Sequence, residues 1–142
     1  QTFRIILLYH YIIKEIKKDG ILLLNTSWTD EELFEKVKKG NVKDNIEEII
    51  ARCVEIKRDI VNEDEFDTGK RQLLNFGHTI GHAIEKCSNA ALLHGEAVGL
   101  GMLSVTRGAE ACGICRESLS DRLLALLVKY GLPTECGLDG AQ

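Results

Sequence analysis

The stretch RQLLNFGHTIGHAIE, residues 71–85, is the part of this sequence that says most about its fold. Read as one α-helix, it places Arg71, Asn75, His78 and His82 at steps of four, three and four residues. Because an α-helix turns by about 100° per residue, these polar side chains share one narrow stripe. Apolar side chains occupy most of the remaining surface: Leu73, Leu74, Ile80, Ala83 and Ile84. We predict a helix that presents a cation, an amide and two imidazoles along one edge.

A third imidazole follows in the segment LHGEA, residues 93–97. His94 lies sixteen residues after His78 and directly before Gly95, where another backbone can approach closely. Histidine is a common ligand of divalent metals, and arginine binds anions through a planar pair of donors. The combination predicts a site for a metal ion and an anionic, hydroxylated small molecule.

Helical patterns continue on both sides of this stretch. Thr29 and Glu32 have the spacing of a capping box that opens a short helix, which ends near Gly40. The further helices are expected over residues 3–19, 43–61, 94–111 and 118–130. No segment has the alternation of a half-buried strand, and no GxGxxG phosphate loop is present. We therefore predict an all-α fold, a single helical bundle-like domain over residues 1–142.

The composition excludes several classes of function. The net charge is −4 and aromatic residues make up 6% of the chain, so neither nucleic acid nor an anionic membrane is an expected partner. No apolar run approaches the ~18 residues of a membrane span. Residues 1–11 faintly resemble a signal peptide, but an initiator Met and a small-residue cleavage site are missing, and we reject that interpretation.

Five cysteines without framework spacing predict free thiols and a cytoplasmic location. Cys112 and Cys115 form a lone CxxC, which suits a redox pair or half of a zinc site. Because no second CxxC exists, we interpret both as small packing residues near a helix end.

Several of the candidate residues also have simpler interpretations. His78 and His82 at HxxxH spacing are a possible metal pair, or two half-buried histidines bonded to backbone groups. Lys57 resembles any solvated lysine when it is taken alone. Asp64 and Glu65 are most simply loop charges, which can also orient Arg71 or Lys57.

The same residues closely resemble the signature of the 3-dehydroquinate synthase family. The resemblance rests on LLNFGHTIGHAIE at 73–85 and LHGEAVGLGM at 93–102, with Lys57, DEFDTGKR at 64–71 and LLALLVKYGLP at 123–133 in support. It is convincing from about residue 43 to residue 134, and its two central motifs are long and specific.

This resemblance implies an enzyme that converts DAHP, a seven-carbon keto-acid phosphate, into 3-dehydroquinate in the shikimate pathway. The family uses NAD and one divalent metal, zinc or cobalt. An N-terminal α/β domain holds NAD, and a helical C-terminal domain holds the metal and much of the substrate site. The chain looks like the second domain alone, without the NAD-binding domain and the family's last helices. We expect it to be inactive in isolation, and we expect the protein to form a homodimer.

Carried onto this sequence, the resemblance makes His78 and His94 metal ligands and assigns His82 to the substrate, as a hydrogen-bonding and proton-handling group. This assignment replaces the pair His78 and His82 that spacing alone suggests. The residues expected to contact the carboxylate, phosphate or hydroxyls of the substrate are Lys57, Arg71 and Asn75.

The third ligand of the family is a glutamate in a Glu-x-x-Lys-x-Gly motif. Glu15 and Lys18 preserve that skeleton, which places Glu15 on the metal and Lys18 near the substrate. An alignment anchored on residues 32–34 instead puts Ile21 and Leu24 in those places and provides no ligand. The register of residues 1–30 stays open between these two alignments.

Three alternative functions remain open. Other sugar-phosphate cyclases share the same motifs, and iron-type alcohol dehydrogenases also show HxxxH followed by His-Gly. The residues Lys57 and Arg71 argue against the dehydrogenases, whose substrates carry no phosphate. The third alternative is a non-catalytic helical module for dimerisation.

Overall fold

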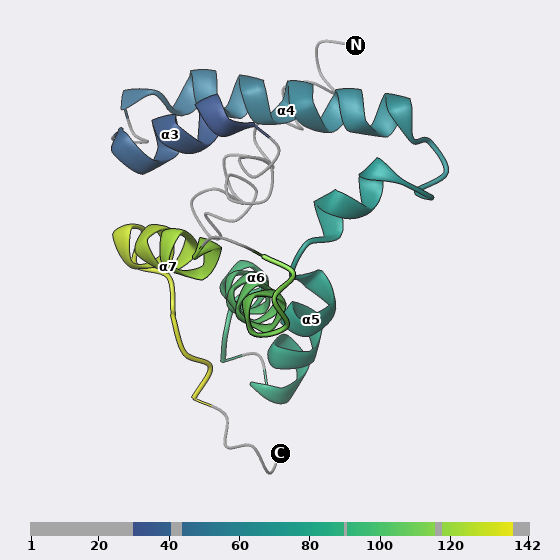
Figure 1. The fold of residues 1–142 in the computed structure, drawn as a ribbon. Coiled ribbons are helices and arrows are strands. Elements are labelled where there is room, and N and C mark those ends of the chain that lie inside the picture. The colour runs from purple at the N-terminus through teal and green to yellow at the C-terminus, as the bar shows by residue number, and fades with distance from the viewer. Residues whose placement is uncertain (1–29, 41–43, 90, 116–117, 138–142) are drawn as a thin grey trace. The chain divides into compact units, whose positions relative to one another are not determined.

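The computed structural model describes residues 30–40, 44–89, 91–115 and 118–137. Every regular element in these ranges is a helix, so the all-α prediction is confirmed (Figure 1). The helices are α3 (Glu31–Lys39), α4 (Ile46–Glu63), the 3₁₀ helix η2 (Lys70–Asn75), α5 (His78–Cys87), α6 (His94–Ala111) and α7 (Leu119–Lys129). The helix expected over residues 3–19 lies outside the described residues. In the described part of the chain, no helix is long and apolar enough to cross a membrane.

The chain divides into two compact units, residues 1–74 and residues 75–142. The single domain over residues 1–142 stays a prediction.

In the first unit, α3 lies beside α4 and both helices bury apolar side chains (Figure 1). The buried side chains of α4 follow the helical repeat, as its amphipathic sequence predicts. They are Ile49, Ile50, Cys53 and Ile56, with Leu33, Phe34 and Val37 buried on α3. Ile46 and Ile60, near the two ends of α4, are only half-buried.

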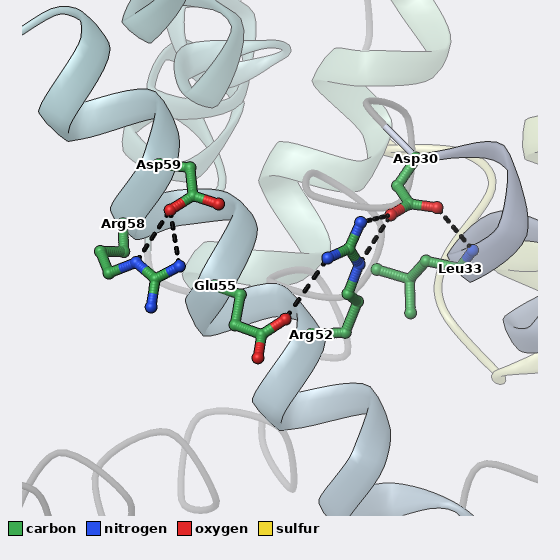
Figure 2. Close-up of polar contacts among 6 residues, drawn as sticks. All are labelled: Asp30, Leu33, Arg52, Glu55, Arg58 and Asp59. Atoms are coloured by element: carbon green, nitrogen blue, oxygen red, sulfur yellow. Dashed lines mark hydrogen bonds and ion pairs between the residues drawn. The ribbon is translucent and has the colours of Figure 1, made fainter.

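Asp30 fixes the start of α3 and ties it to α4. Its carboxylate accepts a hydrogen bond from the backbone N–H of Leu33 at 3.0 Å and forms an ion pair with Arg52 of α4 at 2.7 Å (Figure 2). The Leu33 N–H lowers the pKa of Asp30, and Arg52 adds to this effect against the cost of partial burial. The prediction that Thr29 caps this helix is wrong, because the helix begins one residue later with Asp30 as N-cap.

In the second unit, α6 lies between α5 and α7 (Figure 1). It begins at His94 and ends at Ala111, as predicted, and most of its first three turns is buried. α7 begins after Ser118 and contributes Leu123, Leu126 and Leu127 to the core.

Glycines allow α5 and α6 to pack with their backbones in close contact. A Cβ on Gly81 would lie 2.8 Å from the Cα of Val98, and one on Gly77 would lie 2.6 Å from the backbone N of Met102. Since residue numbers rise on one helix as they fall on the other, the two helices are antiparallel. The same register sets Glu85, one turn beyond Gly81, beside His94.

The prediction of one continuous helix over residues 71–85 is wrong. The 3₁₀ helix ends at Asn75, and Gly77 has a left-handed backbone with φ of 81° before α5 begins. Left-handed geometry suits glycine, and the contact with Met102 leaves no room for a side chain. Arg71 and Asn75 therefore do not continue the helical stripe of His78 and His82.

Candidate metal centre

Three imidazole rings converge where α5 packs against the start of α6. His78 and His82 lie one turn apart on α5, and His94 is the first residue of α6. The ring centroids are separated by 5.8 Å for His78 and His82, 5.6 Å for His78 and His94, and 5.3 Å for His82 and His94. The structure thus brings together all three histidines that the sequence singled out.

Glu85 adds a carboxylate to this group, which we call the histidine cluster (His78, His82, Glu85 and His94). Its Oε2 lies 3.0 Å from Nδ1 of His94. One donor atom each from His82, Glu85 and His94 lie within 4.8 Å of one another. The sequence reasoning missed Glu85, although it follows His82 by three residues and so lies on the same helix face.

His78 is half-buried, and its environment favours the neutral ring. Burial lowers the pKa of His78, and the neighbouring His94 and His82 add to this shift while the backbone at Phe76 and Asn75 opposes it. Its Nδ1 atom is buried and has no hydrogen-bond partner among the described residues. A buried polar atom without a partner is costly, so this nitrogen suits a ligand.

The donor set of the histidine cluster fits a divalent metal. Zinc accepts neutral imidazole nitrogen and carboxylate oxygen, and its catalytic sites use three protein ligands with one position left open. His82, Glu85 and His94 supply three donors of this kind close together. His78 and His94, whose ring centroids are 5.6 Å apart, supply two. Glu15, the expected third ligand, and Lys18 lie outside the described residues, so their roles stay predictions.

The remaining predicted site residues are exposed or half-buried. Asn75 ends η2 and its side chain is exposed. Lys57 is exposed on α4, and Arg71 is half-buried in η2 with its guanidinium donating to the carbonyl of Glu65 at 3.0 Å. Lys57 and Arg71 belong to the first unit, and their approach to the histidine cluster stays a prediction.

Asp64 organises the loop that carries Arg71. Its carboxylate accepts backbone hydrogen bonds from Thr68 at 3.0 Å, Gly69 at 2.7 Å and Arg71 at 3.0 Å. The N–H groups of Thr68 and Arg71 are the main causes that lower the pKa of Asp64. Asp64 therefore holds the backbone of Arg71, and an orienting effect of Asp64 on the guanidinium of Arg71 stays a prediction.

The CxxC pair is separate from the histidine cluster. All five cysteines are free thiols, as predicted. Cys112 lies at the end of α6, as expected, but it is exposed, so the expectation that it is a packing residue is wrong. Cys115 is half-buried.

Comparison with known proteins identifies relatives over most of the chain. Residues 14–141 match the model of the family described as 3-dehydroquinate synthase C-terminal. The 3-dehydroquinate synthase of Clostridium perfringens (strain 13) is 45% identical over 114 residues, which cover 77% of this chain and 33% of that protein. The enzyme of the same name from Streptococcus mutans is 43% identical over 127 residues, 85% of this chain and 34% of that protein. The chain thus spans about a third of the length of the curated relatives it matches.

Proposed function

This chain belongs to the 3-dehydroquinate synthase family, whose C-terminal domain it matches, and on that premise we propose that it provides the metal and substrate side of the conversion of DAHP to 3-dehydroquinate. The observation that carries this proposal is the convergence of His78, His82 and His94, because all three belong to the motifs of the resemblance. The reaction releases phosphate, which makes the proposed activity that of a carbon–oxygen lyase.

We assign His78 and His94 to the metal, zinc or cobalt, with Glu15 as the third ligand. Burial lowers the pKa of His78, which supports the assignment because only the neutral ring offers a lone pair to a metal. When bound, the metal would acidify neighbouring hydroxyls of the substrate and polarise its carbonyl.

The protein's own side chains bind the substrate and handle its protons. His82 is exposed beside the two proposed ligands, where it can exchange a proton with a substrate hydroxyl. Arg71 offers a bidentate fork to a carboxylate or phosphate, and Lys57 offers a point charge. Asn75 and Lys18 complete the set of residues that we expect to hydrogen-bond the substrate.

NAD is the second cofactor of this proposal. In the resemblance it is held mainly by an N-terminal domain that precedes the matched region. The homodimer and the cytoplasmic location remain predictions.

The match to the C-terminal family favours 3-dehydroquinate synthase over the iron-type alcohol dehydrogenases. Another sugar-phosphate cyclase remains the alternative within enzymes. A non-catalytic helical module is the alternative outside them, and it predicts no specific affinity for zinc or cobalt.

Zinc binding tests the proposal directly. We expect the 142-residue chain to bind one zinc ion in competition with a chromophoric chelator. His78→Ala and His94→Ala should each weaken binding by more than about 100-fold, because even the partners of ligands contribute 10–100-fold. His82→Ala is the matched control and should retain the metal.

Two other outcomes of the zinc titration would change the assignment. A wild-type chain without zinc or cobalt affinity would contradict the proposed function. Loss of zinc in His82→Ala but not in His78→Ala would instead assign the metal to His82, Glu85 and His94.

A further inference from the structure

We propose that Glu85 is a positioning residue that accepts a hydrogen bond from Nδ1–H of His94 and thereby presents Nε2 of that ring to the metal. The inference rests on the proposed function and adds to it a residue outside the ligand and substrate sets. It is carried by the 3.0 Å separation between Oε2 of Glu85 and Nδ1 of His94.

Packing alone does not hold the His94 ring in one orientation. The side chain of His94 is 45% exposed and that of Glu85 is 38% exposed. A half-exposed imidazole turns readily about its side-chain torsions unless a directed interaction holds it. The hydrogen bond to Glu85 is such an interaction, and it defines which nitrogen faces away from α5.

The backbone of Glu85 is itself well anchored. Its carbonyl accepts a hydrogen bond from Oγ of Ser88 at 2.9 Å, and the N–H of Ser88 closes the last turn of α5 on Ile84. On the other side, the antiparallel contact of Gly81 with Val98 fixes the separation of the two helices one turn away. The backbone that carries the Glu85 carboxylate is therefore held in place opposite His94.

A carboxylate is well suited to this position. A neutral imidazole carries one N–H, so a partner that accepts it at Nδ1 leaves the lone pair on Nε2. Carboxylate partners of this kind are common for metal-binding histidines, and losing them typically weakens metal affinity.

The experiment compares Glu85→Ala and Glu85→Gln with the wild-type chain, and uses Glu96→Gln as the matched control. Glu96 lies in the first turn of α6, but its carboxylate accepts the backbone N–H of Leu93 and does not contact the ring. Zinc affinity is measured by chelator competition. The tautomer of His94 is measured by long-range ¹H–¹⁵N NMR on the metal-free, histidine-labelled chain.

We expect His94 in the wild-type chain and in Glu96→Gln to carry its proton on Nδ1 and to bind zinc through Nε2. Glu85→Ala should move the proton toward Nε2 and weaken zinc binding about 10- to 100-fold. Glu85→Gln keeps an acceptor without the charge, so it should recover the tautomer and only part of the affinity. If the role of Glu85 were purely structural, the variants would change thermal stability. The His94 tautomer and the zinc affinity would then not differ between Glu85→Ala and Glu85→Gln in this way.

Two results would overturn the inference. One is a His94 ring that keeps its proton on Nδ1 in Glu85→Ala with unchanged zinc affinity. The other is a cobalt absorption spectrum that shows the loss of one ligand in both Glu85 variants, which would make Glu85 a direct ligand. If the wild-type chain binds no zinc, the proposed function fails, and the tautomer of His94 in the metal-free chain still decides whether Glu85 orients the ring.

Discussion

Asp30 combines two interactions whose strength depends on its charge. Its carboxylate is 11% exposed, caps α3 through the N–H of Leu33 and pairs with Arg52 of α4 (Figure 2). Figure 2 also shows Asp59, which pairs with Arg58 beside it on the same helix but is 61% exposed. The two aspartates thus differ mainly in burial and in the elements that they connect.

We expect Asp30→Asn to destabilise the chain by about 1 kcal/mol at pH 7, because the amide keeps the cap but loses the ion pair. The pKa of Asp30 is lower in the folded chain than in the unfolded one, where it is near 3.8. The contribution of the charge is therefore complete above pH 3.8 and is lost as the pH falls through the folded pKa.

Urea unfolding of both proteins at pH 7 and at acid pH measures this difference. The gap between wild type and Asp30→Asn should close in acid, while Asp59→Asn should match wild type throughout. A gap of the same size at every pH would mean that the charge of Asp30 does not stabilise the fold.

At the scale of elements, the contact between α5 and α6 depends on residues without side chains. A Cβ on Gly101 would lie 2.1 Å from the carbonyl oxygen of Gly77 and 2.7 Å from the backbone N of Gly81. Both neighbours are backbone atoms, so relief requires the helices to separate. Gly108 lies two turns later on α6, and no described atom is within 4 Å of its added Cβ.

We predict opposite effects for two identical substitutions on α6. Gly101→Ala should destabilise the chain by about 1–3 kcal/mol through overpacking and should also weaken zinc binding, because His94 is carried by the same helix. Gly108→Ala should stabilise it by about 0.5–1 kcal/mol, since alanine favours a helix. Chemical denaturation and zinc titration of both variants check this, and a tolerated Gly101→Ala would contradict the close packing.

The boundaries of the helices were largely predictable, whereas the break at Gly77 was not. The glycine-rich helix from His94 to Ala111 was expected with its observed bounds, because apolar and small residues continue over its length. The polar stripe of residues 71–85 also has the spacing of one continuous helix, although the structure breaks it at Gly77. Only the tertiary contact of Gly77 with Met102 explains why the chain turns there, and such a contact leaves no local pattern.

The sequence predicted the three histidines of the histidine cluster but not Glu85. The identities of His78, His82 and His94 follow from the motifs, and their convergence follows once α5 and α6 are antiparallel. Glu85 escaped notice because an acidic residue near a helix end is ordinary. Its role depends on the partner that the register brings opposite, His94.

At the scale of the whole molecule, the activity should require more than this chain. We expect the 142-residue chain to show no turnover of DAHP with NAD and zinc. A fusion that supplies the unmatched parts of the Clostridium perfringens relative should restore zinc-dependent release of phosphate, because the match covers only 33% of that protein.

Phosphate release by the fusion protein is the measurement, and His94→Ala in the same fusion is its control. The control should lower turnover by more than about 100-fold, which corresponds to more than ~2.7 kcal/mol of transition-state stabilisation. A fusion whose turnover does not respond to His94→Ala would argue against the ligand assignment.

The antiparallel pairing of α5 and α6 has a consequence for how the protein folds. His78 and His94 are separated by only sixteen residues, and the helical hairpin that joins them includes every member of the histidine cluster. Contacts of such low sequence separation form early, because little loop entropy is lost when they close. We therefore expect the four side chains of the histidine cluster to come together early in folding, as soon as this hairpin forms.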